Sequence, residues 1–329
     1  MKLKNRRIIM PALLAALLLA AAVPAQALFG KKAEEPAEPV PGAPIAKAVS
    51  IRTYRNIPYR AQFLAVDEEG GALTFSVAEA PKRGTVSISG DTFTYTPADG
   101  KTGKDRFTYV ATDEDGNVSA PAEVTVTVEK TKSGVAYQDT QDSPAAAAAQ
   151  YLAERGVFTG ACMGGSYYFE PERTVSRGEF LAMTMELAEL PADAVTMTGF
   201  SDDAAIPTWA KAYAAAGLAE GIVRGVSTET GAAFCSAEPV TFNEAAAMLD
   251  RVLSVGDVDL ETWYAGRDAA PSWAAQAVGN LEAVSVMAAG SFGSGTLSQP
   301  MTRADAARML CAAGTLLEGE KPGLLDWMR

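Results

Sequence analysis

Three short stretches of this sequence share one pattern: "VSRGEF", "VTFNEA" and "MTRADA" begin at residues 175, 240 and 301. In each stretch an acid stands three positions after a hydroxyl residue. This spacing is typical of a capping box, in which the hydroxyl accepts a hydrogen bond from an early helical N–H and the acid accepts one from the N–H of the hydroxyl residue. The sequence therefore predicts three helix starts, at Ser176 with Glu179, Thr241 with Glu244, and Thr302 with Asp305.

The three starts recur at a nearly constant distance. The spacings are 241 − 176 = 65 and 302 − 241 = 61 residues, which indicates a repeat architecture. Apolar residues follow the starts at offsets of 4, 7, 8 and 11, on one face of a helix, with Thr184 as the one polar residue in this set. An earlier helix is predicted in each unit, because an alanine-rich stretch begins there at a proline, the favoured first-turn residue: Pro144, Pro207 and Pro271.

Further elements recur at matching places in the units. Upstream stand "YQD" at Tyr137, "FSD" at Phe200 and a degraded "YAG" at Tyr264, and the first helix of two units ends in Gly-x-x-x-Gly. The assembled unit resembles the S-layer homology (SLH) repeat. We expect three such repeats at 137–192, 198–256 and 262–317, followed by a short tail at 318–329.

The resemblance implies a pseudo-threefold α-helical bundle with grooves between neighbouring repeats. Its expected ligand is an acidic secondary cell-wall polysaccharide, often carrying a pyruvyl ketal, and the attachment is non-covalent. The residues that the resemblance places at the glycan are Arg177, Arg303, Trp209, Trp273, Asn243, Gly160 and Gly225. No repeat is complete: Phe242 replaces an arginine, Ala146 a tryptophan, Gly266 an acid and Ser285 a glycine.

Several of these residues have a second interpretation. Arg177 and Arg303 lie in the first turn of a helix, where a cation faces the positive end of the helix dipole; an anion held there would explain them, and so would ion pairs with Glu179 and Asp305 at the surface. The tryptophans either stack on sugar rings or pack between repeats. Asp139 and Asp202 are predicted to brace loops rather than to contact the ligand.

Between residues 48 and 130 the hydrophobic period becomes two. "LTFSVA", "TFTYT", "RFTYVA" and "EVTVTVE" alternate apolar and polar residues, and Gly90-Asp91 fits a two-residue hairpin turn. About seven strands of this kind predict an antiparallel β-sandwich, and the phrase "GDTFTYTPADGKTGKDRFTYVATDEDGN" resembles bacterial Ig-like or cadherin-like domains. Such domains are usually spacers or adhesive modules. Asp67, Asp113 and Asp115 either bind calcium or form polar turns.

The N-terminus has the form of a secretory signal peptide at 1–27: a basic start, a short apolar run and "AQA". A Pro/Ala-rich linker follows at 28–47, and no membrane span is expected after cleavage. Loss of four cations changes the formal charge from −12 to about −16, because −12 − 4 = −16, which disfavours nucleic acid as a partner.

The composition excludes common catalytic arrangements. The chain has no histidine, which excludes Ser-His-Asp and Cys-His catalysis. We interpret the three cysteines, Cys162, Cys235 and Cys311, as buried small apolar residues; the alternative is a disulfide pair or a reactive thiol. We therefore expect a multidomain, non-enzymatic, cell-surface protein with no cofactor, calcium in the sandwich being the one alternative left open. In it an all-β Ig-like/cadherin-like sandwich precedes an all-α pseudo-threefold SLH bundle that binds cell-wall glycan. The alternative is a degenerate SLH module that serves as a protein–protein interaction scaffold at the cell surface without binding glycan. A surface protein is a further candidate partner, for the sandwich. An enzyme that acts on glycan through paired carboxylates is disfavoured, because the acids are spread among caps and turns.

Overall fold

The computed structural model describes residues 42–67, 69–264 and 271–320. Within them the chain divides into two compact units, one ending at Lys130 and the other beginning at Thr131. The predicted signal peptide, the first part of the linker and the end of the tail lie outside the described residues, as does Gly266. No helix in the described ranges is long and apolar enough to cross a membrane.

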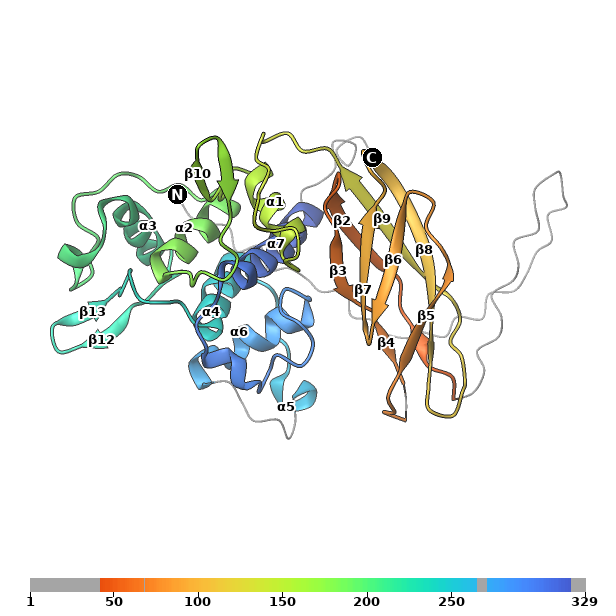
Figure 1. The fold of residues 1–329 in the computed structure, drawn as a ribbon. Coiled ribbons are helices and arrows are strands. Elements are labelled where there is room, and N and C mark those ends of the chain that lie inside the picture. Colours follow the sequence, from red (N-terminus) through yellow and green to blue (C-terminus); the bar gives the residue numbers. More distant parts are fainter. Residues whose placement is uncertain (1–41, 68, 265–270, 321–329) are drawn as a thin grey trace, which may run out of the picture. The chain divides into compact units, whose positions relative to one another are not determined.

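The first unit is a β-sandwich (Figure 1). Its four-stranded sheet has the order β2-β9-β8-β5, its three-stranded sheet the order β3-β7-β6, and β1 pairs with β4. Alternate residues of the strands, among them Phe93, Tyr95, Phe107 and Tyr109, are fully buried between the sheets, as the period of two requires. The strands are β1 (Ile45–Ala46), β2 (Val49–Tyr54), β3 (Tyr59–Gln62), β4 (Ala65–Val66), β5 (Thr74–Glu79), β6 (Gly84–Ser89), β7 (Thr92–Pro97), β8 (Gly103–Thr112) and β9 (Ala122–Glu129).

The sandwich differs from the prediction in two respects. It has nine strands rather than about seven, because Ile45 pairs with Val66 ahead of the predicted boundary at residue 48. The expectation of a wholly antiparallel sandwich is wrong, since β2 and β9 are parallel. These are the first and last long strands of the unit, so no hairpin fixes their direction. The turn at Gly90-Asp91 is confirmed, with Ser89 paired to Thr92 across it.

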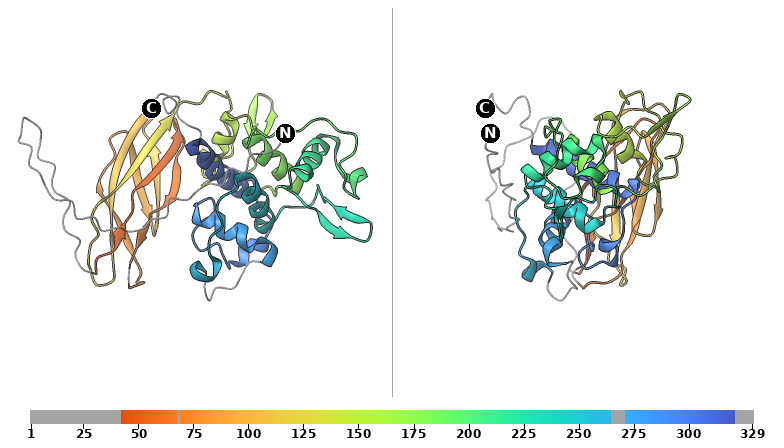
Figure 2. Two further views of the ribbon diagram at one scale, coloured as in Figure 1. Left: turned by 180° about the vertical axis from the view of Figure 1, so that it is seen from behind. Right: turned by 90° about the vertical axis from the view of Figure 1, so that its left-hand side faces the viewer.

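The second unit consists of helices and two small hairpins. The helices are α1 (Ala146–Glu154), α2 (Arg177–Leu187), α3 (Thr208–Ala219), α4 (Phe242–Leu253), α5 (Leu260–Trp263), α6 (Ser272–Ala283) and α7 (Arg303–Glu320), with the 3-10 turns η1 (Asp203–Ala205) and η2 (Gly295–Ser298). The hairpins are β10–β11 (Ala161–Met163, Ser166–Tyr168) and β12–β13 (Val226–Thr228, Gly231–Ala233). Within the unit α7 packs against α1, α2 and α4 (Figure 2).

The entrances of α2, α4 and α7 interlock in a closed cycle. The N–H of Val175 donates to the carbonyl of Met301 (3.0 Å), that of Met301 to Val240 (2.8 Å), and that of Val240 to Val175 (2.9 Å). The residue before and the residue after each of these three make a second cycle of β-bridges, Thr174 with Thr302, Ser176 with Pro239, and Thr241 with Pro300. The three segments are therefore equivalent in their contacts as well as in their sequence.

The third repeat departs from the other two. Hairpins stand before α2 and α4, whereas the described residues before α7 form η2. An aromatic pair persists nonetheless: Tyr264 stacks on Phe292 with ring centroids 4.1 Å apart. Helix α7 continues to Glu320, past the predicted start of the tail, because its last turns lie against α1, where the Tyr151 hydroxyl donates to Glu318.

The prediction that the cysteines are buried is wrong. Cys162 is exposed on β10, and Cys235 and Cys311 are half-buried; all three are free thiols. The sequence pattern missed the exposure of Cys162 because a short hairpin strand has no core face to cover it.

Candidate ligand-binding junctions of the helical unit

Each of the three hydroxyl–acid pairs forms a capping box. The N–H groups of Ser176, Thr241 and Thr302 donate to the acids three positions on at 2.8, 2.9 and 3.2 Å, and the hydroxyl oxygens accept from the acids' own N–H groups at 3.2, 3.4 and 3.2 Å. Aspartate in the third repeat thus closes the box as glutamate does in the other two. The caps fix where each helix begins, and so fix where the next residue points.

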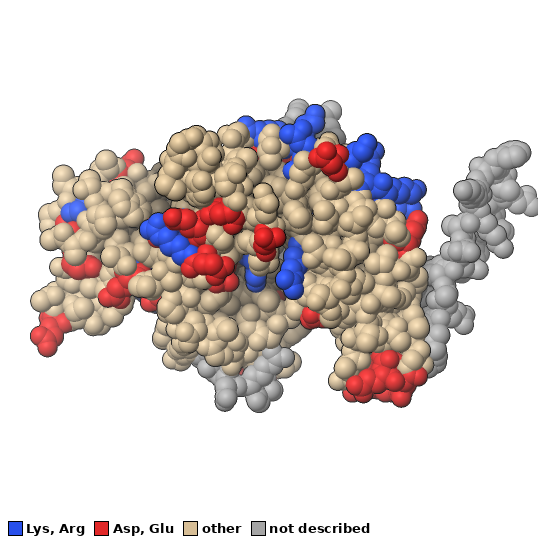
Figure 3. All heavy atoms as spheres, in the orientation of Figure 1, with Lys and Arg blue, Asp and Glu red and all other residues tan. Residues whose placement is uncertain are grey.

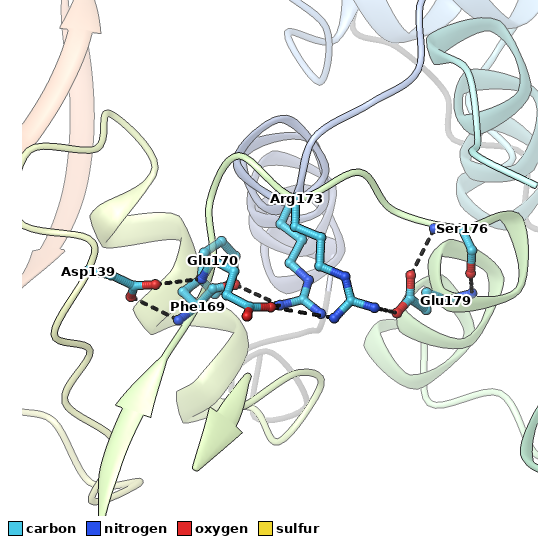
Figure 4. A network of polar contacts seen from close by, with 7 residues as sticks. Asp139, Phe169, Glu170, Arg173, Ser176 and Glu179 are labelled. Atoms are coloured by element: carbon cyan, nitrogen blue, oxygen red, sulfur yellow. Dashed lines mark hydrogen bonds and ion pairs between the residues drawn. The ribbon is translucent and has the colours of Figure 1, made fainter. Parts of the chain in front are cut away.

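Arg303, the first residue of α7, lies in the junction with the first repeat. Its Nη1 donates to Glu170 (2.8 Å) and to the carbonyl of Phe169 (2.9 Å), and its guanidinium lies over the Phe158 ring at 4.9 Å. Glu170 also pairs with Arg173, which reaches Glu179 at 3.6 Å (Figure 4). Burial and the charge of Arg173 lower the pKa of Arg303, against the opposing effect of Glu170.

Arg177 occupies the equivalent place between the first and second repeats. It lies over the Phe234 ring at 5.8 Å and pairs with Glu244 at 2.7 Å. Cys235 stands where the first repeat has Glu170, so the cap acid of the next helix becomes the partner instead. Arg177 is 9% exposed, Arg303 is 7% exposed, and the Nε of Arg177 has no hydrogen-bond partner. The alternative interpretation, ion pairs with Glu179 and Asp305 at the surface, is wrong as to the partners, which are Glu244 and Glu170.

The remaining junction contains no arginine. Phe242 opens α4 there, and its N–H donates to the carbonyl of Gln299 at 3.4 Å. Asn243, predicted to contact the glycan, is 3% exposed, and its side-chain oxygen has no partner. A residue so deeply buried offers no surface to a sugar, because the cap at Thr241 turns the second position of α4 toward the interior.

Two aspartates brace loops in the first two repeats. Asp139 accepts from the N–H groups of Phe169 and Glu170, and Asp202 accepts from those of Phe234 and Cys235, at 2.7–2.9 Å. Glu170 and Cys235 have positive φ angles of 55° and 57°. The carboxylates thus hold a strained turn directly under each buried arginine.

Gly160 and Gly225 lie in the same two loops. Both have positive φ angles (69° and 77°), and a Cβ atom on either one would meet a backbone carbonyl and an aromatic ring, those of Tyr168 and Tyr137 or of Ala233 and Phe200. These contacts show that the glycines allow close packing of each loop. The contacts do not place either glycine at an open groove.

Trp209 and Trp273 stand at the second residue of α3 and α6. They are 51% and 57% exposed, so neither is buried between repeats. A third tryptophan, Trp263, is 66% exposed on α5, outside the repeated motif. Exposed indole faces are suited to stacking on sugar rings.

In the sandwich, the acids proposed for calcium serve their own turns. Asp67 accepts from the N–H of Gly71 (2.8 Å), and Asp113 accepts from the N–H and the side-chain amide of Asn117 (2.8 and 3.0 Å). Desolvation by itself would raise the pKa of Asp113, but these bonds and those from the N–H groups of Asp115 and Gly116 lower it overall. No group of three or more acids or cysteines with metal-binding geometry occurs in the described part of the chain.

Comparison with known families identifies the sandwich. Residues 41–128 match the family model of the bacterial Ig domain. This segment is a bacterial Ig domain. The family match covers less than a third of the chain, and no SLH family matches the repeats. No curated protein matches the chain.

Solved structures that are similar to this chain match less than a third of its length. An endo-fucoidan hydrolase of glycoside hydrolase family 107 is 24% identical with a TM-score of 0.24, over 28% of this chain and 14% of its own. The SrpA adhesin of Streptococcus sanguinis is 15% identical with a TM-score of 0.22, over 30% of this chain and 61% of its own. The fibronectin(III)-like modules of Clostridium thermocellum CbhA are 20% identical with a TM-score of 0.20, over 27% of this chain and 47% of their own. The chain thus spans about a seventh of the hydrolase, and likenesses this weak say nothing of its activity.

The partners of the arginines were not predicted from the sequence. Glu170 and Glu244 belong to the repeat that follows each arginine around the cycle, and they lie 133 and 67 residues from it in sequence. A signal was present in the alignment of the repeats: Phe169 and Phe234 both stand seven positions before a cap hydroxyl. Without the closed cycle, that alignment does not tell which arginine approaches which phenylalanine, nor that Arg177 lies over the ring of Phe234 whereas Arg303 bonds to the carbonyl of Phe169.

Proposed function

We propose that this protein is exported to the cell envelope, where its helical unit binds an acidic secondary cell-wall polysaccharide without a covalent bond. A sugar bearing a pyruvyl carboxylate is the proposed epitope. The bacterial Ig domain then acts as a spacer or adhesive module displayed from the wall. The presence of a bacterial Ig domain at residues 41–128 is consistent with such a surface location.

The observation that carries this proposal is the closed cycle of the three helix entrances. The backbones of the three segments bond head to tail, from Val175 to Met301 to Val240, and this supports the proposal of a pseudo-threefold bundle of the SLH kind. The junctions between repeats are where a ligand of such a module would bind, and two of them contain a guanidinium.

The chemistry of the junctions assigns different roles to the candidate residues. Trp209 and Trp273 are open to solvent and would contact the sugar rings. Arg177 and Arg303 are already paired with Glu244 and Glu170, so a sugar carboxylate would bind the remaining edge of the guanidinium or displace the protein carboxylate. Displacement costs less at Arg303, because Glu170 is 43% exposed whereas Glu244 is 26% exposed.

Binding to purified wall fractions tests the proposal. The mature chain should sediment with walls, and removal of pyruvyl groups should release it. Trp209→Ala/Trp273→Ala should weaken retention about tenfold, a loss of roughly 1.4 kcal/mol, without changing the melting temperature, since both side chains are exposed. Trp263→Ala is the matched control and should bind as the wild type does. Equal retention of all variants, with and without pyruvyl groups, would contradict the proposal.

One observation favours the alternative, a scaffold that binds no glycan. Both guanidinium groups are covered and neutralised within the protein, and the third junction has Phe242 instead. The scaffold predicts that the mature chain does not bind walls, and that Arg303→Gln changes stability alone. The binding experiment above separates the two functions.

A further inference from the structure

Cations gather at one end of the Ig domain from four separate parts of its sequence. Each follows or begins a strand at that end: the loop after β2, the turn between β5 and β6, the loop after β7 and the start of β8. We call this set the basic end: Arg55, Lys82, Arg83, Lys101 and Lys104, all exposed.

Hydrogen bonds tie these four segments together. Asn56 donates to Asp99, which joins the loop after β2 to the loop after β7 (2.9 Å). The N–H of Ala98 donates to the carbonyl of Arg83 (2.8 Å), and Arg83 donates to the carbonyl of Thr102 (2.9 Å). The buried Asp105 of β8 accepts from the N–H groups of Lys82 and Arg83 at 3.0 and 2.8 Å. The segments that carry the basic end are thus connected by hydrogen bonds into one surface.

The cations of the basic end have no ionic partner in the described residues. Most acids near the basic end do not neutralise these cations. Asp105 is buried, Asp99 accepts a hydrogen bond from Asn56, and Glu129 pairs with Arg52. Glu79 is the remaining acid nearby, and it forms no ion pair with them in the described residues. This is unexpected in a chain with 40 acids and 28 cations, where neutralising partners are abundant.

The opposite end of the Ig domain has the reverse charge (Figure 3). Acids follow the strands there, where β4, β6 and β8 end: Asp67, Glu69, Asp91, Asp113, Glu114 and Asp115. The exposed large apolar residues of the domain also lie on that side, on or beside β1, β4 and β6 and after β8: Ile45, Leu64, Val66, Ile88 and Val118. The basic end therefore attracts anions and has no exposed large apolar side chain among the described residues.

We propose that the basic end of the Ig domain binds an anionic polysaccharide. This site is separate from the junctions of the helical unit and does not depend on the function proposed for them. Within the Ig domain, a flexible anionic polymer can contact the basic end without approaching the acids, which follow the strands at the opposite end. A bilayer is disfavoured because interfacial binding draws on buried apolar area as well as on charge, and the apolar side chains lie at the other end.

The proposal is tested with the mature full-length chain and fluorescein-labelled polygalacturonate as the probe. Fluorescence anisotropy should detect binding that weakens steeply between about 50 mM and about 200 mM salt, as expected for contacts with a polyanion. Neutral dextran should not bind. Lys82→Gln/Lys101→Gln/Lys104→Gln should weaken polygalacturonate binding about tenfold. The melting temperature should not change, since these exposed side chains make no hydrogen bond or ion pair in the described part of the chain.

A matched control changes the same net charge elsewhere. Lys47→Gln/Arg106→Gln/Arg308→Gln removes three exposed cations outside the basic end and should bind like the wild type. Equal weakening by the two triple variants would overturn the proposal, because it would show a response to net charge alone. Tighter binding of duplex DNA or of phosphatidylglycerol vesicles than of polygalacturonate would overturn the choice of partner.

Discussion

At the scale of single residues, glycines in the loops of the first two repeats separate into two kinds. Gly156 and Gly221 end the first helices with positive φ angles and have open space where a Cβ would be. Gly160 and Gly225 also have positive φ angles, but there a Cβ would collide with a carbonyl and an aromatic ring. The motif Gly-x-x-x-Gly therefore combines a conformational requirement with a steric one.

This difference predicts unequal effects of alanine. Gly221→Ala should cost about 1 kcal/mol of unfolding free energy, the usual cost of a left-handed residue. Gly225→Ala should cost about 2 kcal/mol more, because overpacking adds to the strain. Urea denaturation followed by circular dichroism measures both. If Gly221→Ala were as damaging as Gly225→Ala, the steric explanation would be wrong.

The charged form of the Asp250 carboxyl is disfavoured in the folded protein. Burial raises its pKa and the charge of Asp257 adds to this, against a hydrogen bond from Asn280 and the charge of Arg251. Asn280 is 1% exposed and donates to both carboxylates, at 3.0 and 3.1 Å. The folded state binds this proton more tightly than the unfolded state does.

The raised pKa of Asp250 predicts how the stability of the helical unit depends on pH. Asp250 should lower the stability of the helical unit as pH rises from about 4 through its raised pKa. Asp250→Asn keeps an acceptor for Asn280 and removes the charge, so it should raise the melting temperature at pH 7 more than at pH 4. Asp193→Asn, an exposed site, is the control. A variant that melts lower than wild type at pH 7 would refute this account.

At the scale of elements, carboxylates that accept from two successive N–H groups hold the loops in place. Asp139 and Asp202 do this in the first two repeats, and Asp105 does it in the Ig domain. The third repeat has Gly266 where an acid is expected, and Glu282 of α6 accepts instead from Gly290 and Phe292, at 3.0 and 2.7 Å. An acid from a helix thus takes over a role that a loop acid has in the other repeats.

Asp105 provides a test of such a brace. Burial alone would raise its pKa, but hydrogen bonds from three backbone N–H groups and from the Tyr95 hydroxyl lower it overall. Its contribution to stability is therefore present above about pH 4 and is lost as pH falls through the lowered pKa. Asp105→Asn should cost about 1–3 kcal/mol at pH 7. Asp99→Asn, at the exposed neighbouring acid, should change stability by less than about 0.5 kcal/mol, and similar effects of both changes would rule out the brace.

At the scale of the whole molecule, the closed cycle makes the three repeats depend on one another. Removal of α7 would leave Val175 without the carbonyl of Met301 and would uncover the face of α1 that α7 buries. We predict that a chain ending at Ser298 loses the cooperative melting transition of the helical unit while the Ig domain still melts as before. Calorimetry of the full and shortened chains measures both transitions. A shortened chain that keeps the helical transition would show that the cycle is dispensable.

The sequence alone determined the parts of this protein that depend on local spacing. Capping pairs three residues apart place the starts of α2, α4 and α7, and alternation in the Ig domain places the strands and the turn at Gly90-Asp91, because those features depend on bonds between residues close in sequence. The sequence did not determine the parallel pairing of β2 with β9, the burial of Asn243, or the carboxylates that neutralise Arg177 and Arg303. Each of these is a contact between residues distant along the chain, and only the closing of the sandwich and of the three-repeat cycle decides which of them meet.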